Sequence, residues 1–251
     1  MKKLLPILSL VIILFSCRNE NELIGKWYEI NEESRFEFKN DSLIVSNPFF
    51  YKGAYRTSKN TIHFKYDNMF NDSLATQNYI YKLNHDSLAV QYATNPNEKT
   101  TFIKAKSFTD FILKKNYSNI DLGSSEKAEY QSTNTKYGIK VFIEKIKDSI
   151  SVKTEYSKNI ENLNYDITCI LNELEPNFKN EYNTFKDRWT FDEWIKMNIY
   201  YSLFVDKNIS ENDITKVVKK LRKSDIHKIY RTYETKEEFG IPFDNLKEVK
   251  L

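Results

Sequence analysis

The stretch Ile62-His63-Phe64-Lys65-Tyr66 alternates apolar or aromatic residues with basic ones. Successive side chains of a β-strand point to opposite faces, so this period of two predicts a strand with one buried face and one wet face. Arg35-Phe36-Glu37-Phe38 repeats the pattern further upstream. The two stretches indicate that the first part of the chain folds as antiparallel β-structure.

Similar short runs recur through the first part of the chain and predict about eight strands, at 25–30, 34–39, 42–46, 51–57, 61–66, 78–83, 87–92 and 100–105. Polar groups that can bend the chain separate them, at Asn40-Asp41, Lys59-Asn60, Asn84-His85-Asp86 and Asn95-Pro96-Asn97. No apolar periodicity of helical length interrupts the series. Eight short antiparallel strands with close turns predict a meander that closes into a barrel and leaves no exposed edge.

The residues before the first strand carry a family resemblance. Leu23-Ile24-Gly25-Lys26-Trp27 resembles the Gly-x-Trp opening of lipocalin-like domains, in which the tryptophan closes the bottom of the barrel. The resemblance implies barrel-closing roles for Gly25 and Trp27 and a lipocalin-like barrel over 23–106. The later arginine and Thr-Asp-Tyr elements of that family are not recognisable in this chain.

Two alternatives are open for the barrel interior. The side chains expected to point inward are large, namely Phe36, Phe38, Phe64, Tyr66, Tyr79, Tyr81 and Phe102. They either fill the interior by themselves or line a site for one small apolar ligand. A ligand site would require a cavity of roughly 300 Å³ or more within the meander.

The first sixteen residues have the pattern of a secretory signal, in which Lys2 and Lys3 precede an apolar run from Leu4 to Phe15. A bilayer span needs roughly 20 apolar residues, so this shorter run predicts a cleaved signal peptide over 1–16. The alternative is a signal-anchor with an incidental cysteine.

Leu14-Phe15-Ser16-Cys17 resembles the lipobox of bacterial lipoproteins, although Phe15 is bulkier than that motif usually carries. The resemblance implies acylation of Cys17, for example with palmitate, and a lipidated tether over 17–22. Arg18 stands where an aspartate would resemble an inner-membrane retention signal. We therefore expect an outer-membrane lipoprotein of the cell envelope, facing either the periplasm or the outside.

Composition excludes some classes of function. Removing residues 1–16 lowers the formal net charge from +3 to +1, which gives no reason to expect nucleic acid as a partner. The chain has five glycines and contains neither GxxxxGK[ST] nor GxGxxG, so a Gly-rich phosphate loop is excluded. Cys169 has an apolar context and is expected to be an inert buried thiol.

A linker is expected over 107–136, because this stretch is polar and rich in loop residues, and a second domain over 137–251. Residues 137–146 and 149–156 predict a hairpin around Lys147-Asp148. A helical stripe then follows and is expected to stop at Pro176, with Leu163, Ile167, Ile170, Leu171 and Leu174 on one face. A second helical piece carries Phe178, Tyr182, Phe185 and Trp189 at similar spacing.

Two helix starts are predicted from capping patterns. Thr190-Phe191-Asp192-Glu193 is a capping box flanked by two tryptophans, and Ser210 precedes a helix with a buried face of Ile214, Val217, Val218 and Leu221. Residues 198–205 and 226–233 are predicted as strands, with helix as the alternative for each. The predicted order is β-β-α-insert-β-α-β, an α+β domain.

The segment from Leu203 to Ser210, with the helix and strand after it, resembles the periplasmic domain of the ExbD/TolR biopolymer-transport family. There a strand ends in an aspartate-containing turn before a helix and a last strand. The membrane helix of that family, with its proton-carrying aspartate, is missing here. The resemblance therefore implies a protein-docking fold in the envelope and not energy transduction.

Motifs for catalysis are absent from the sequence. His63, His85 and His227 lie apart without metal-ligand spacing, and no GxSxG or SxxK occurs, so we expect no catalytic residues, metal or cofactor. The preferred hypothesis is a non-enzymatic envelope lipoprotein that binds a protein or peptide partner. The alternatives are a carrier of a small apolar ligand in the barrel and a hydrolase whose paired acids assemble in space.

Overall fold

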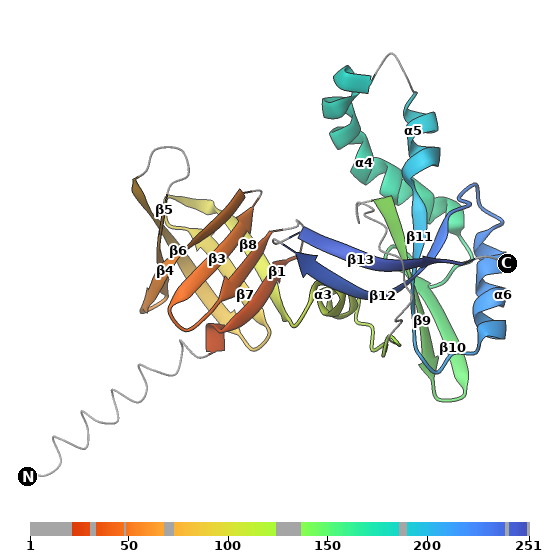
Figure 1. The fold of residues 1–251 in the computed structure, drawn as a ribbon, viewed down its shortest axis with the longest axis horizontal. Coiled ribbons are helices and arrows are strands. Elements are labelled where there is room, and N and C mark those ends of the chain that lie inside the picture. The colour runs from red at the N-terminus through yellow and green to blue at the C-terminus, as the bar shows by residue number, and fades with distance from the viewer. Residues whose placement is uncertain are drawn as a thin grey trace, which may run out of the picture. The chain divides into compact units, whose positions relative to one another are not determined.

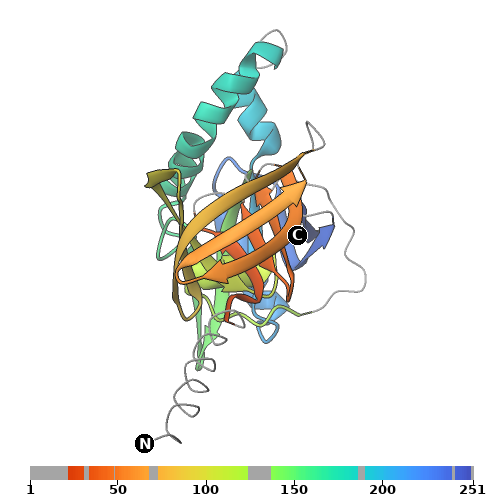
Figure 2. The same cartoon turned by 90° about the vertical axis from the view of Figure 1, so that its left-hand side faces the viewer.

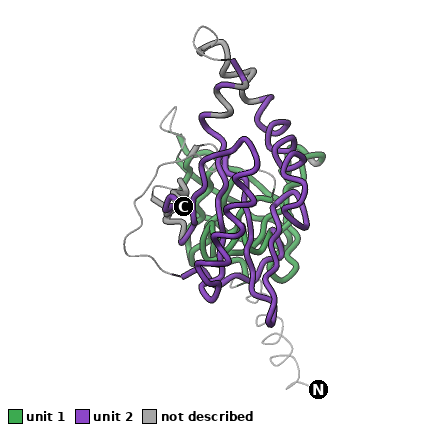
Figure 3. The backbone as a smooth tube through the Cα atoms, turned by 90° about the vertical axis from the view of Figure 1, so that its right-hand side faces the viewer, with its two compact units in different colours: residues 1–115 green, residues 116–251 purple. Residues whose placement is uncertain are grey.

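The computed structural model describes residues 22–30, 34–47, 49–67, 73–123, 137–185, 190–238 and 241–249. The chain divides into two compact units, residues 1–115 and 116–251 (Figure 3). The predicted signal peptide and Cys17 lie outside the described residues. Within the described part, every helix is too short or too polar to cross a membrane.

The first unit is a closed barrel in which each strand pairs with the next and β1 also pairs with β8, all antiparallel (Figures 1 and 2). Its strands are β1 (Gly25–Glu29), β2 (Arg35–Phe38), β3 (Ser42–Asn47), β4 (Phe49–Ser58), β5 (Thr61–Asp67), β6 (Leu74–Asn84), β7 (Ser87–Tyr92) and β8 (Asn95–Ala105). The prediction of a closed eight-stranded antiparallel barrel is confirmed.

Two of the predicted turns use left-handed backbone, with φ of 55° at Lys59 and 50° at His85. The turn predicted at 95–97 is wrong, because β8 already begins at Asn95 and the chain turns at 93–94. The pairing of β7 with β8 shifts register between Gln91 and Tyr92. Proline has no N–H to donate to the hydrogen-bond ladder, so Pro96 fits within a strand only where the pairing is irregular, as it is here.

Helix α3 (Phe108–Lys115) follows the barrel and lies at the start of the stretch predicted as linker. Ser107 Oγ accepts from the Asp110 backbone N–H at 3.2 Å, and Asp110 accepts from the Lys106 N–H at 2.8 Å. The helix packs against the outward side of β1, where the Tyr28 ring stacks on Phe111 at a centroid distance of 5.3 Å. Capping and this aromatic contact explain why the polar stretch begins as a helix.

The second unit is built on a mixed five-stranded sheet in the order β10-β9-β11-β12-β13 (Figure 1). Its strands are β9 (Gly138–Ile146), β10 (Ser149–Thr154), β11 (Tyr200–Val205), β12 (Ile229–Glu238) and β13 (Ile241–Glu248). Strand β11 runs parallel to both of its neighbours, and the two outer pairs are antiparallel. The strands predicted over 198–205 and 226–233 are confirmed, whereas β13 was not predicted.

Helices α4 (Leu163–Phe185) and α6 (Glu211–Leu221) cover one face of this sheet, and α5 (Phe191–Asn198) follows α4. Alternate residues of β9 and β11 supply the sheet side of the core, which includes Ile139, Val141, Ile143, Tyr201, Leu203 and Val205. All six residues of β11 are buried. A central strand with parallel neighbours is buried on both faces, and its sequence is therefore typically a continuous run of apolar residues.

Helix α4 does not stop at Pro176 as predicted, but continues to Phe185. Proline inside a helix removes one backbone hydrogen bond and is tolerated where water can satisfy the freed carbonyl. Pro176 lies on an exposed position, which meets that condition. The two predicted helical pieces are therefore one helix.

The predicted helix starts are confirmed. Ser210 Oγ accepts from the Asp213 N–H at 3.2 Å, and Thr190 and Glu193 exchange the two bonds of a capping box. The predicted buried face of α6 is also confirmed, with Ile214, Val217, Val218 and Leu221 all buried. The side chains of Trp189 and Trp194 lie outside the described part of the chain.

Candidate functional site

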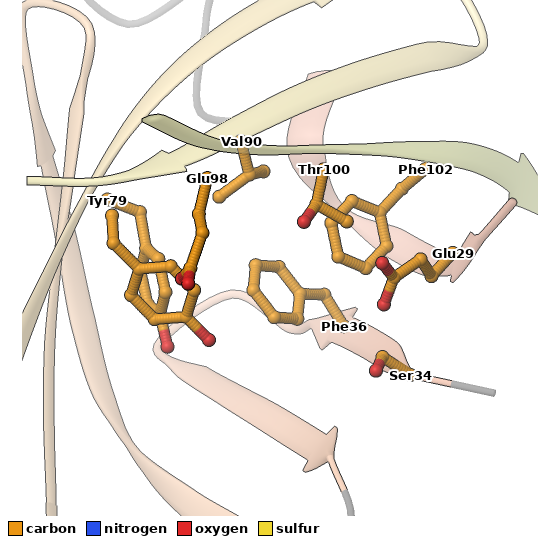
Figure 4. A pocket seen from close by; sticks show the side chains of 9 residues that line it. Glu29, Ser34, Phe36, Tyr79, Val90, Glu98, Thr100 and Phe102 are labelled. Atoms are coloured by element: carbon orange, nitrogen blue, oxygen red, sulfur yellow. The ribbon is translucent and has the colours of Figure 1, made fainter. Parts of the chain in front are cut away.

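The barrel contains a cavity of about 360 Å³. It lies at the end of the barrel where β1 connects to β2 and β7 to β8, because its lining includes Glu29 at the end of β1, Ser34 before β2 and Tyr92 at the end of β7. Its full lining is Glu29, Ser34, Phe36, Tyr79, Val90, Tyr92, Glu98, Thr100 and Phe102 (Figure 4).

Aromatic rings form a connected wall of this cavity. Phe36 stacks on Phe102 at a centroid distance of 4.7 Å and meets Tyr79 at 5.3 Å. Tyr79 in turn meets Tyr92 at 5.3 Å. Burial raises the pKa of Tyr79 above its ordinary value, with smaller contributions from Tyr92 and Tyr66, so its phenol stays protonated. The wall therefore presents apolar faces and neutral hydroxyls.

Two carboxylates enter the same space. Figure 4 shows the side chains of Glu29 and Glu98 projecting into the cavity on either side of the Phe36 ring. Glu29 is buried, with 9% of its surface exposed, whereas Glu98 is exposed at the mouth. The lining therefore carries two acidic side chains and no basic one.

The opposite end of the barrel is filled. Trp27 has no exposed surface, and its indole N–H donates to the Leu23 carbonyl at 2.7 Å. Lys104 Nζ lies 5.2 Å from the centre of the Trp27 ring. Gly25 has φ of +126°, a conformation that L side chains rarely adopt, so the chain needs glycine there. This geometry fits the barrel-closing roles that the sequence suggests for Gly25 and Trp27.

The inward residues named from the sequence fall into two groups. Phe36, Tyr79 and Phe102 border the cavity. Phe38, Phe64 and Tyr81 belong to the packed interior, Tyr66 is partly buried against it, and all four are absent from the cavity lining. The barrel is therefore filled over part of its length and has a cavity at one end.

Sequence reasoning missed the polar members of the lining. Alternation along β1 turns Glu29 to the same side as Trp27, and alternation along β8 turns Glu98 and Thr100 to the side of Phe102. A charged residue at an inward position of a barrel strand was the signal that could have identified them. Glu98 was missed because residues 95–97 were predicted as a turn, so Glu98 was not assigned to a strand.

The remaining candidates for chemistry stay apart. His63 Nδ1 lies 2.8 Å from Asn78 Oδ1, whereas His85 and His227 are exposed. Among the described residues, no group of three or more His, Cys, Asp or Glu is placed to hold a metal ion. Cys169 is partly exposed, which corrects the expectation of a buried thiol.

The second unit contains a buried carboxyl group at Asp166, which has no exposed surface. Its Oδ1 accepts from Ser157 Oγ at 2.5 Å, while Oδ2 is buried without a hydrogen-bond partner among the described residues. Burial raises the pKa of Asp166 above its ordinary 3.8, although hydrogen bonds from Ser157 and Thr154 oppose this. The folded chain therefore holds a proton there at pH values where the unfolded chain releases it.

Replacing this carboxyl is expected to change how stability depends on pH. Because the pKa of Asp166 is raised by folding, its contribution to stability falls as pH rises from about 4 through the raised pKa. The free energy of unfolding of Asp166→Asn should therefore improve, relative to the parent, as the pH rises above about 4. The change is about 1.4 kcal/mol for each pH unit by which the pKa is raised.

Urea unfolding at several pH values measures this difference. Asp148→Asn is the matched control, because Asp148 is exposed in the β9–β10 turn. It should follow the parent at every pH. A difference between Asp166→Asn and the parent that stays constant with pH would contradict the assignment of a raised pKa.

No family model matches the chain, and neither a curated protein nor a solved structure matches it.

Proposed function

We propose that this protein is an envelope lipoprotein that binds a small, largely apolar molecule in the open end of its barrel. The cavity of about 360 Å³ carries this proposal. Small-molecule sites are typically clefts of about 300–1,000 Å³ lined by apolar and aromatic side chains with a few polar groups. The lining meets the size criterion and combines five apolar or aromatic residues with four polar or charged ones, so it is more polar than the usual site. The packed interior around Trp27 closes the other end of the barrel.

A cavity-filling substitution tests the proposal. Thr100 lines the cavity, whereas Thr101 is the next residue of β8 and by alternation points to the outer face. The neutral fluorescent probe N-phenyl-1-naphthylamine should bind the purified full-length protein and its Thr101→Trp variant alike. Thr100→Trp should weaken that binding at least about ten-fold, because the indole would occupy the cavity. Equal binding by both variants would remove the carrier function.

Membrane attachment is the second part of the proposal and rests on Cys17. Two acyl chains give stable anchoring, where one chain alone is marginal. Cys17→Ser should abolish labelling with palmitate and move the protein from the membrane fraction to the soluble fraction. Cys169→Ser is the control, since it removes the other of the two cysteines and should leave both properties unchanged. A palmitate label that survives in Cys17→Ser would contradict the anchor.

A second candidate function is docking of a protein or peptide partner, which the sequence favoured. Strand β10 lies at the end of the sheet order, and the hairpin it forms with β9 exposes 49% of Ile146 and 40% of Ile150. Exposed edge strands can pair with an extended peptide. A photo-crosslinker at Ile150 should then capture one envelope protein in intact cells. The same crosslinker at Lys219, on the exposed side of α6, should not.

A further inference from the structure

The charged residues that line the cavity are both acidic. Glu29 and Glu98 are the ionisable carboxylates of the lining, and none of its nine residues is basic. Arg35 precedes a lining residue in the sequence, but it lies on the other face of β2, where its Nη2 is 3.5 Å from Glu37. The lining therefore contributes negative charge that an anionic ligand, such as a fatty acid, would have to oppose.

The aromatic wall adds to this preference. The face of an aromatic ring is negatively polarised and attracts a cation within about 6 Å of its centre. Phe36, Tyr79 and Phe102 surround the space into which both carboxylates project (Figure 4). Rings and carboxylates together form the usual surroundings of a bound organic ammonium group, with apolar contact on several sides and a counter-charge on another.

The polar groups present suit an organic cation better than a metal ion. A metal ion such as Ca²⁺ is coordinated by roughly six to eight oxygen atoms at short, well-defined distances. Among the described residues, no three or more His, Cys, Asp or Glu side chains are placed so that they could hold a metal ion. Ser34, Thr100 and the tyrosine hydroxyls can instead accept hydrogen bonds from the N–H groups of an amine.

We propose that the ligand of this cavity is a small organic amine, cationic at neutral pH, with an apolar or aromatic body. Glu29 binds the ammonium group in the interior, the rings hold the body, and Glu98 attracts the cation at the mouth. This inference rests on the proposed carrier function and names the chemical class of its ligand. The volume of about 360 Å³ limits the ligand to the lower end of the size range of drug-like molecules.

Three probes that have nearly the same shape but different charges test whether the cavity selects its ligand by charge. They are 1-naphthylmethylamine, which is cationic, 1-naphthalenemethanol, which is neutral, and 1-naphthoate, which is anionic. Calorimetric titration of the purified full-length protein should give an affinity for the amine at least about ten-fold above that for the alcohol, as for a hydrogen bond between charged groups. The naphthoate should bind more weakly than the alcohol.

Substitution of the interior carboxylate tests its role. Glu29→Gln should reduce the ratio of amine affinity to alcohol affinity to about one. Asp41→Asn is the matched control, because it also removes one negative charge from the barrel but lies exposed in the β2–β3 turn. It should keep the ratio of the parent. If Glu29→Gln fails to fold, Glu98→Gln at the exposed mouth should lower the same ratio.

The outcomes distinguish the two proposals. Equal affinities of the parent for amine and alcohol would overturn the amine inference and leave the carrier function intact. A higher affinity for the amine that persists in both glutamine variants would also overturn the inference, because the cation would then bind elsewhere. Absence of binding by all three probes, together with equal N-phenyl-1-naphthylamine binding by the Thr100→Trp and Thr101→Trp variants, would remove the carrier function itself.

Discussion

Replacing Trp27 with alanine is expected to destabilise the barrel by about 3–5 kcal/mol, the range for deleting a large aromatic side chain from a core. Trp27 is one of the largest side chains with no exposed surface. Its removal leaves a cavity at the closed end and also deprives the Leu23 carbonyl of its hydrogen bond from the indole. Hydrogen exchange resolved by peptide should show much faster exchange in β1, β2 and β8.

Trp27→Phe separates the contribution of apolar packing from that of the indole hydrogen bond to Leu23. Phenylalanine retains much of the apolar volume but cannot donate to Leu23, so a smaller loss of about 1–2 kcal/mol is expected. Peptides from β9 and β11 provide an internal control, because they belong to the other compact unit. Unchanged exchange in the barrel strands of Trp27→Ala would show that the indole does not close the barrel.

The barrel was predictable because its strands are local and regular. Alternation of large and polar residues, as in Ile62-His63-Phe64, fixes which face of each strand is buried. Two-residue turns such as those at Lys59 and His85 follow from polar residues that accept left-handed backbone. Strand ends were less predictable, because the register shift beside Pro96 depends on pairing with the neighbouring strand and not on local sequence.

The cavity could not be derived from the same pattern. Phe36 and Phe38 occupy equivalent inward positions of one strand, yet only Phe36 borders the open space. Whether two inward rings touch depends on the tilt and stagger of strands that are distant in sequence. The sequence could name the inward residues, but only the assembled barrel separates the filled part from the open part.

The second unit shows a similar limit. Helix α6 was predictable because Ser210 caps it and its buried stripe has helical spacing. Strand β13 was not, because it begins Ile241-Pro242 and alternates weakly, features that argue against a strand in a sheet interior. It lies at the sheet edge, where proline is tolerated. Helix α3 carried a capping pattern, Ser107 to Asp110, that its polar surroundings obscured.

The two ends of the barrel differ in the residues at their inward positions. At one end, Trp27 and its neighbours fill the interior and fix the strands. At the other end, an acidic residue stands at the next inward position of the same strand, where an apolar residue would have continued the core. Burying a carboxylate costs solvation free energy, so Glu29 contributes less to core stability than an apolar residue would at this position. The proposed binding role of Glu29 is a prediction that the Glu29→Gln variant tests.

Gly53→Ala is expected to destabilise the barrel by about 3 kcal/mol, the upper end of the usual range for overpacking. Gly53 lies in β4 opposite Tyr66 of β5, between the inward residues Tyr51 and Tyr55. A Cβ atom at Gly53 would stand 2.0 Å from the Lys65 carbonyl oxygen and 2.7 Å from the Tyr66 Cα. Both are backbone atoms, so the strand itself must move. Glycine at such a point marks a close approach of another backbone segment.

Thermal unfolding of Gly53→Ala should occur well below that of the parent, with faster hydrogen exchange confined at first to β4 and β5. Gly123→Ala is the matched control, because its added Cβ would meet only the Lys207 Cβ, at an ordinary 3.4 Å. Alanine lowers the conformational entropy of the unfolded chain, so the free energy of unfolding of Gly123→Ala should be unchanged or slightly higher than that of the parent. If both variants melt with the parent, the strands β4 and β5 do not approach each other at Gly53 as closely as the Cβ distances indicate.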